Sequence, residues 1–155
     1  MTERKLPIGV QSFQSLRESG YLYVDKTQYI EQLLRGKVYF LSRPRRFGKS
    51  LFLSTLAAYF RGEKELFGGL YLAQAEEELA RQSKREAWQK HPVLYLDLNA
   101  KNFDTKQALI DTLERHLLNW EQEYNLVHRF DAPEDRFYDI IEQLYRSTGT
   151  RVVVL

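Results

Sequence analysis

The chain has 155 residues, of which 43% are hydrophobic, and a formal net charge of +2. This length suits one compact domain with its own core, and so small a charge does not by itself demand a nucleic-acid partner. Because there is no cysteine, a disulfide framework and thiol chemistry are excluded.

Two further features exclude membrane and secretory classes. No apolar run approaches the ~20 residues of a membrane span. The N-terminal Met-Thr-Glu-Arg-Lys is not followed by the apolar segment of a secretory signal. We therefore expect a cytoplasmic protein without a membrane partner.

The first 36 residues predict a helical lead-in. Helical patterns cover 10–19 and 26–35, on either side of a short extended run at 21–24. Asp25 stands where the N-cap of the second helix is expected.

A strand, a loop and a helix are predicted next. The apolar run 38–42 precedes the basic loop 43–50, and an amphipathic stretch follows over 51–61. In such a setting, backbone N–H groups and the positive end of a helix can hold nucleotide phosphates. The sequence therefore predicts a phosphate-binding loop; the alternative is a solvated basic turn.

The match to the phosphate-loop motif G-x-x-x-x-G-K-[ST] is partial. Gly48, Lys49 and Ser50 stand where the motif requires them, but Arg43 replaces its first glycine. In this motif the lysine contacts the outer phosphates and the serine hydroxyl ligates magnesium. The planar guanidinium groups of Arg43, Arg45 and Arg46 also suit phosphate. Alternatively, Arg43 and Arg46 pair with acidic side chains elsewhere in the fold.

The rest of the chain alternates between helices and strands. Helices are predicted over 73–88, over 105–124 with Asp104 as its cap, and from 133, and strands over 92–98 and 151–155. Strands separated by helices predict an α/β fold with a parallel sheet. Glu76, Glu77 and Glu78 are interpreted as a solvated helix face.

Few other residues suggest chemistry. Asp97 ends a predicted strand, where open α/β sheets place ligand-facing groups, so it could lie just outside the magnesium ligands. A structural aspartate is the alternative. His91, His116 and His128 lack metal-ligand spacing and are interpreted as structural or surface residues.

Several strings in this order resemble the predicted AAA-ATPase-like family of bacterial proteins. The resemblance covers nearly the whole chain from about residue 6. The strings are Leu6-Pro7-Ile8-Gly9, Tyr21-Leu22-Tyr23-Val24-Asp25-Lys26-Thr27, residues 39–51 with Arg43-Pro44-Arg45-Arg46-Phe47-Gly48-Lys49-Ser50-Leu51, Leu66-Phe67, Trp88 and residues 92–97. Arg43 is the family's usual variant at that position.

The resemblance implies an ATP-binding module with a P-loop NTPase-type parallel sheet flanked by helices. ATP and Mg²⁺ are the implied cofactors, with Ser50 as the magnesium ligand. The nucleotide-binding residues are then Arg43, Pro44, Arg45, Arg46, Phe47, Gly48, Lys49, Ser50 and Leu51. Asp25, Lys26 and Thr27 would lie on the adenine side, unless they form an ordinary helix cap. Longer members commonly add a restriction-endonuclease-like domain.

The resemblance also predicts an incomplete domain. Relatives continue the strand at 151–155 into the Walker B acids, which hold magnesium and polarise the attacking water. We therefore expect one partial domain over 1–155, with a lead-in at about 1–36 and a P-loop core at about 37–155, and a chain that hydrolyses ATP poorly. A sheet lacking its later strand would expose apolar edges and invite association.

Two other functions stay open. One is a non-catalytic interaction module whose arginine-rich loop binds nucleic-acid phosphate or an acidic partner. The other is a degenerate fragment without activity. The choice of ATP over GTP is carried by the resemblance alone.

Overall fold

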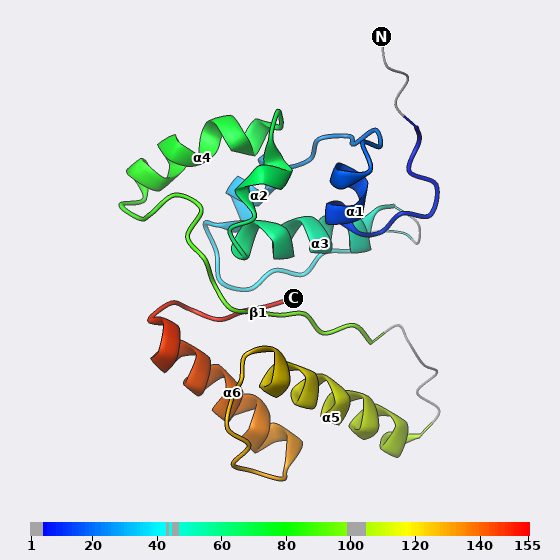
Figure 1. Cartoon of the computed structure of the whole chain (residues 1–155), viewed down its shortest axis with the longest axis vertical. Helices are drawn as coiled ribbons and strands as arrows, with labels where there is room; N and C mark the ends of the chain where they lie inside the picture. The colour runs from blue at the N-terminus through cyan, green and yellow to red at the C-terminus, as the bar shows by residue number, and fades with distance from the viewer. Residues whose placement is uncertain (1–4, 43, 45–46, 99–104) are drawn as a thin grey trace. The chain divides into compact units, whose positions relative to one another are not determined.

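The computed structural model describes residues 5–42, 44, 47–98 and 105–155, drawn in colour in Figure 1. The chain divides into two compact units, Met1–Lys90 and His91–Leu155, and each is described by itself. The expectation of one partial domain over the whole chain stays a prediction.

The first unit is helical in its described part. Its elements are α1 (Phe13–Glu18), α2 (Gln28–Leu33), α3 (Lys49–Phe60), the 3₁₀ helix η1 (Lys64–Phe67) and α4 (Tyr71–Gln82). Helix α1 packs against α3 and η1, and α2 packs against α4. The helices predicted around 10–19, 26–35 and 51–61 are therefore present, with shifted ends.

Aromatic side chains fill the core of this unit. Phe13 and Phe67 are fully buried, and their ring centroids lie 5.0 Å apart. The Trp88 ring lies 5.2 Å from Phe67, and Tyr59 packs edge-on against Trp88. Such offset and edge-on pairs add to the free energy gained from burying the rings. These four aromatic residues therefore belong to the core of this unit.

The strand predicted over 38–42 is wrong for this structure. Within the described part of the first unit no residue is in a strand. Val38 is 91% and Phe40 94% exposed, whereas the Tyr39 hydroxyl donates to the Gln32 carbonyl at 3.0 Å. Residues with strand propensity form a strand only where a neighbouring strand pairs with them. The described residues of this unit provide no such strand.

The interpretation of Glu76 as solvated is also wrong. Glu77 and Glu78 are exposed, but Glu76 is completely buried. Its carboxylate accepts hydrogen bonds from the Tyr59 hydroxyl at 3.0 Å, from the backbone N–H of Trp88 at 3.0 Å and from both terminal nitrogens of Arg85. Helix α4 ends at Gln82, before the predicted 88, and the chain then folds back so that Arg85 and Trp88 reach Glu76.

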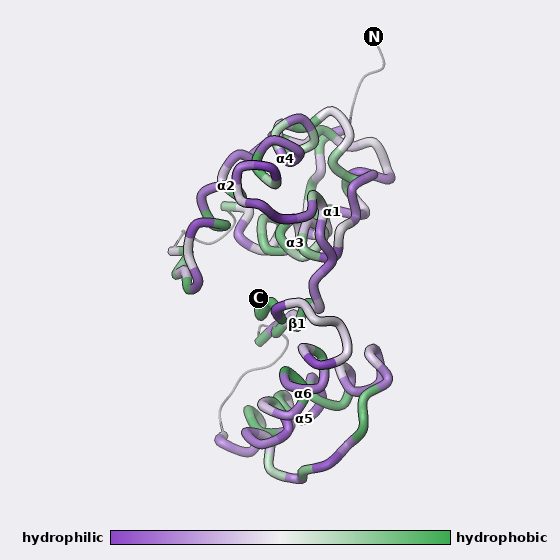
Figure 2. Tube along the Cα trace, turned by 90° about the vertical axis from the view of Figure 1, so that its left-hand side faces the viewer, coloured by the Kyte–Doolittle hydropathy of each residue, from purple (hydrophilic) through white to green (hydrophobic). Residues whose placement is uncertain are grey.

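The second unit joins two helices to a pair of parallel strands. Its elements are β1 (Val93–Leu94), α5 (Lys106–Glu123), α6 (Pro133–Thr148) and β2 (Val153–Val154). Val93 pairs with Val153, and Leu94 with Val154. The chain is therefore α/β, with a two-stranded parallel sheet flanked by helices, and β1 and β2 are hydrophobic (Figure 2).

The core of this unit lies between α5, α6 and the strands. Its buried members are Leu94, Leu117, Trp120, Ile140 and Leu144. Phe137 and Ile141 pack against them, so one face of α6 is turned toward this core. Helix α5 is capped by Thr105, whose hydroxyl accepts from the Ala108 N–H at 3.1 Å. The predicted cap, Asp104, lies outside the described residues.

Tyr124 closes one edge of β1. Its hydroxyl accepts from the Val93 N–H at 3.0 Å and donates to the Val93 carbonyl at 3.1 Å. The opposite edge bonds β2, for example through the Val153 N–H to the Pro92 carbonyl at 2.9 Å. The tyrosine therefore occupies the groups that a further strand would need at Val93. Strand β1 covers Val93–Leu94, which is shorter than the predicted 92–98.

Candidate functional site

The start of α3 carries the motif glycine. Gly48 is the N-cap of α3 and has a left-handed backbone with φ 73°. A side chain there would be strained although nothing lies within 4 Å of its Cβ position. The requirement for glycine is therefore conformational, as expected where a loop turns into a helix.

The N-terminus of α3 is open to an anion. The first hydrogen bond of the helix runs from the Phe52 N–H to the Gly48 carbonyl at 2.9 Å, and none of the described side chains caps this end. No acidic residue stands in the first turn. Because the leading N–H groups lack intrahelical partners and the helix dipole is positive there, this end favours negative charge.

The structure places four of the nine predicted nucleotide residues together at this end: Gly48, Lys49, Ser50 and Leu51. Lys49 is exposed and Ser50 is half-buried, so both remain accessible. Phe47 is 62% exposed and Pro44 is exposed. The predictions for Arg43, Arg45 and Arg46 lie outside the described residues.

Two contacts fasten the start of the chain to α3, one turn beyond Ser50. The Ser54 hydroxyl accepts from the Phe13 N–H at 2.7 Å. The Tyr23 and Thr55 hydroxyls lie 3.4 Å apart. Phe13, at the start of α1, and Tyr23 are therefore held to the helix that carries the loop.

The side chains of Asp25 and Thr27 bond the first two N–H groups of α4. One Asp25 carboxylate oxygen accepts from the Thr27 N–H and hydroxyl at 2.8 and 2.7 Å. The other accepts from the Tyr71 N–H at 2.6 Å, and the Thr27 hydroxyl accepts from the Leu72 N–H at 3.1 Å. The N-cap of α2 is Thr27, without a capping side chain, so the prediction of Asp25 for that position is wrong. The adenine-side role of Asp25, Lys26 and Thr27 stays a prediction.

The same hydrogen bonds set the acidity of Asp25. Burial raises the pKa of this carboxyl, but the bonds from Tyr71 and Thr27 outweigh that effect, and the net pKa lies below the ordinary value of 3.8. A carboxyl with a depressed pKa in the folded state stabilises the fold at pH values above the unfolded-state pKa. This contribution is lost as the pH falls through the folded-state pKa.

Replacing Asp25 by alanine is expected to cost about 1 kcal/mol near neutral pH, as for other lost helix caps. The loss should shrink as the pH falls below the ordinary value of 3.8 and through the depressed pKa of the folded wild-type carboxyl. Hydrogen exchange of the α4 amides against pH measures both effects. Glu18→Ala is the control, because Glu18 is exposed in the same unit and accepts from the Gln14 side chain one turn earlier on α1. A loss that stays the same as the pH falls through the depressed pKa would contradict the capping role.

A magnesium role for Asp97 stays a prediction. Asp97 is exposed and belongs to the second unit, and its carbonyl lies 3.0 Å from His116 Nε2. Among the described residues no group of three or more His, Asp or Glu could hold a metal ion. Nor is any helix of the described chain long and apolar enough to cross a bilayer.

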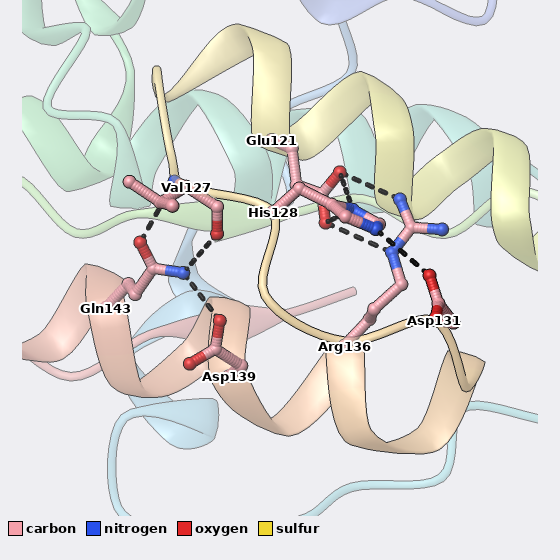
Figure 3. Close-up of polar contacts among 7 residues, drawn as sticks. All are labelled: Glu121, Val127, His128, Asp131, Arg136, Asp139 and Gln143. Carbon is pink, nitrogen blue, oxygen red and sulfur yellow. Dashed lines mark hydrogen bonds and ion pairs between the residues drawn. The ribbon is translucent and has the colours of Figure 1, made fainter.

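The structure also shows a polar cluster between α5 and α6 that the sequence did not predict. Glu121 accepts two bonds from Arg136, at 3.1 and 2.7 Å, and His128 Nδ1 lies 3.2 Å from the same carboxylate (Figure 3). Gln143 bonds both the N–H and the carbonyl of Val127. A shallow hollow of about 430 Å³ adjoins the cluster, lined by Asp111, Glu114, Arg115, Leu118, His128 and Arg136. Since Glu121 and Arg136 are occupied with each other, the cluster holds the connecting loop.

Comparison with known proteins covers nearly the whole chain. Residues 7–155 match a family described as "Predicted AAA-ATPase". A relative from Azotobacter chroococcum mcd 1, "Uncharacterized protein in vnfD 5'region", is 40% identical over 158 residues, which cover 100% of this chain and 29% of the relative. The chain thus spans less than a third of that relative's length. No solved structure matches. The chain belongs to the predicted AAA-ATPase family.

Proposed function

We propose that the chain is an ATP-binding module that holds the phosphates of Mg-ATP at the start of α3. The observation that carries the proposal is the G-K-S string at an uncapped helix N-terminus, in a chain of a predicted AAA-ATPase family. The local arrangement suits the ligand: a left-handed glycine with open space beside it, a lysine and a serine in the first turn, and no carboxylate there.

Each residue of the motif has its own task. Gly48 turns the chain so that backbone N–H groups face the phosphates. Lys49 supplies a mobile positive charge toward the β- and γ-phosphates, and Ser50 ligates the magnesium. Arg43, Arg45 and Arg46 add contacts to phosphate or to a neighbouring domain. The bound magnesium would neutralise charge on the phosphates.

Hydrolysis and further partners are proposed for a longer protein. The parallel strands β1 and β2 of the second unit would belong to a larger P-loop NTPase-type sheet, and the Walker B acids would follow in that sheet. A nuclease-like domain beyond the ATPase is proposed from the family resemblance. The relative from Azotobacter chroococcum mcd 1 is several hundred residues long, since the match covers 29% of it, and so has room for such a domain. A cytoplasmic location is likewise proposed from the family resemblance.

Calorimetric titration of Mg-ATP into the folded chain tests the proposal. Saturable binding is expected, and Lys49→Ala should weaken it by about 10- to 100-fold, the value of a hydrogen bond to a charged group. Lys64→Ala is the control. Exposed Lys64 follows the C-terminal end of α3 and is paired with Glu77. Undiminished binding by Lys49→Ala would contradict the proposal.

The same samples test the interaction-module alternative. A phosphate-binding surface made of arginines should bind a single-stranded oligonucleotide, lose affinity steeply with salt, and weaken equally in Lys49→Ala and Arg45→Ala. ATP binding should respond to Lys49→Ala far more than to Arg45→Ala. Oligonucleotide binding with equal losses, in the absence of ATP binding, would favour the alternative.

A further inference from the structure

The first turn of α3 is held by two hydroxyls that have no task in the function proposed above. The Ser54 hydroxyl donates to the Leu51 carbonyl at 3.1 Å, and the Thr55 hydroxyl donates to the same carbonyl at 2.9 Å. Leu51 directly follows Ser50, the proposed magnesium ligand, and lies in the turn whose leading N–H groups would face the phosphates. The two hydroxyls therefore fix this turn from one turn farther along the helix.

Each of these hydroxyls is also bonded to the part of the chain before the loop. The Ser54 oxygen accepts from the Phe13 N–H at 2.7 Å. The Thr55 oxygen makes a longer contact, at 3.4 Å, with the Tyr23 hydroxyl. Because the single Thr55 proton goes to Leu51, Tyr23 is the donor in this contact. Two chains of hydrogen bonds thus run from the N-terminal segment to one carbonyl of α3.

The contact between Phe13 and Ser54 joins the docking of α1 to the first turn of α3. Phe13 is completely buried and is the first residue of α1, so its N–H has no acceptor within that helix. Ser54 supplies the acceptor, and α1 packs against α3 (Figure 1). The same hydroxyl therefore serves the docked helix on one side and the phosphate-facing turn on the other.

Hydroxyls that bond a carbonyl three or four residues earlier are common in helices and by themselves imply no function. Helix α6 has such a pair, because Ser147 and Thr148 both donate to the Leu144 carbonyl, at 3.1 and 2.7 Å. The pair on α3 differs in that each oxygen also meets a donor 41 or 32 residues away in the sequence. The pair on α6 therefore provides a matched control.

We propose that Ser54 and Thr55 are positioning residues that couple phosphate binding at the start of α3 to the docking of α1 and Tyr23. This inference rests on the phosphate site proposed above. A ligand that orders the first turn favours the docked segment, and the docked segment raises the affinity for the ligand by the same factor. Because the coupling acts through the phosphates, it is expected for a ligand that has no base.

Calorimetric titration of Mg-tripolyphosphate into the folded chain tests the coupling. Ser54→Ala should weaken binding about threefold, within the value of one neutral hydrogen bond, and Ser54→Thr should restore it because the hydroxyl returns. Tyr23→Phe should weaken binding less, since its contact is longer. Ser147→Ala is the control and should bind as the wild type does, because it removes the same kind of bond from the other unit.

Hydrogen exchange of single amides distinguishes coupling from a merely structural role. Saturating Mg-tripolyphosphate should slow exchange of the Phe13 amide about threefold in the wild type and leave it unchanged in Ser54→Ala. The Leu72 amide is the internal reference, because it is bonded by Thr27 in the same unit and has no link to α3 through these hydroxyls. Its exchange should not respond to the ligand.

The outcomes separate the two proposals. If Lys49→Ala weakens binding while Ser54→Ala and Tyr23→Phe do not, or if the ligand slows the Phe13 and Leu72 amides equally, the coupling is overturned and the phosphate site stands. If the wild type does not bind, or Lys49→Ala changes nothing, the phosphate site fails and the coupling fails with it. Circular dichroism checks folding. Should Ser54→Ala not fold, Tyr23→Phe decides, because it keeps the aromatic ring, packed 5.1 Å from that of Phe13.

Discussion

Replacing Glu76 by alanine is expected to destabilise the first unit by about 4 kcal/mol, the range measured when one partner of a buried ion pair is removed. The carboxylate is fully buried and accepts from three groups at once: the Tyr59 hydroxyl, the Arg85 guanidinium and the backbone N–H of Trp88. Burial beside this carboxylate raises the pKa of Tyr59, which therefore stays protonated and donates. Without Glu76, each of these groups loses its acceptor in the core.

Hydrogen exchange read on peptides from α3 and α4 measures this loss in the first unit alone. Glu77→Ala is the matched control: Glu77 stands next along the same helix, is 61% exposed and pairs only loosely with Lys64 at 3.7 Å. Its replacement should change stability by less than about 0.5 kcal/mol. A similar small effect from both variants would show that Glu76 is not buried among these partners.

Replacing Arg136 by alanine is expected to destabilise the second unit by about 3 kcal/mol. Arg136 and Glu121 are 10% and 8% exposed and form a two-bond pair between α6 and α5. The variant leaves the Glu121 carboxylate with His128, which is half-exposed. Urea unfolding followed by exchange on α5 and α6 peptides measures the change. Arg146→Ala is the control, because Arg146 lies on the same helix, is 71% exposed and pairs with Glu142.

The pH dependence of this pair has a definite sign. Burial raises the pKa of Glu121, but the bonds from Arg136 and His128 outweigh that effect and hold the net pKa below 4.5. The folded state is therefore stabilised above pH 4.5 and loses this contribution as the pH falls through the depressed pKa. Arg136→Ala should lose most of that acid sensitivity. A variant as acid-sensitive as the wild type would contradict the assignment to Glu121.

Local sequence was sufficient where the signal is periodic or conformational. Helix α6 begins at Pro133 and buries Ile140 and Leu144, as its spacing predicts. Gly48 and Lys49 mark the start of α3 because a left-handed residue followed by a helical pattern is a local feature. The family was likewise recognisable from short strings of residues, since this chain carries the family's strings in the family's order.

Only the tertiary structure decided which groups distant in sequence meet. Asp25 caps a helix that begins 46 residues later, at Tyr71, and no local signal names that partner. Glu76 is buried, unlike Glu77, because the chain after α4 folds back and brings Arg85 and Trp88 to it. The apolar run around Phe40 has strand propensity but lies exposed, since a strand forms only where another is placed beside it. Sequence therefore determined the helices and the loop motif, and long-range hydrogen bonding and burial determined the role of each polar side chain.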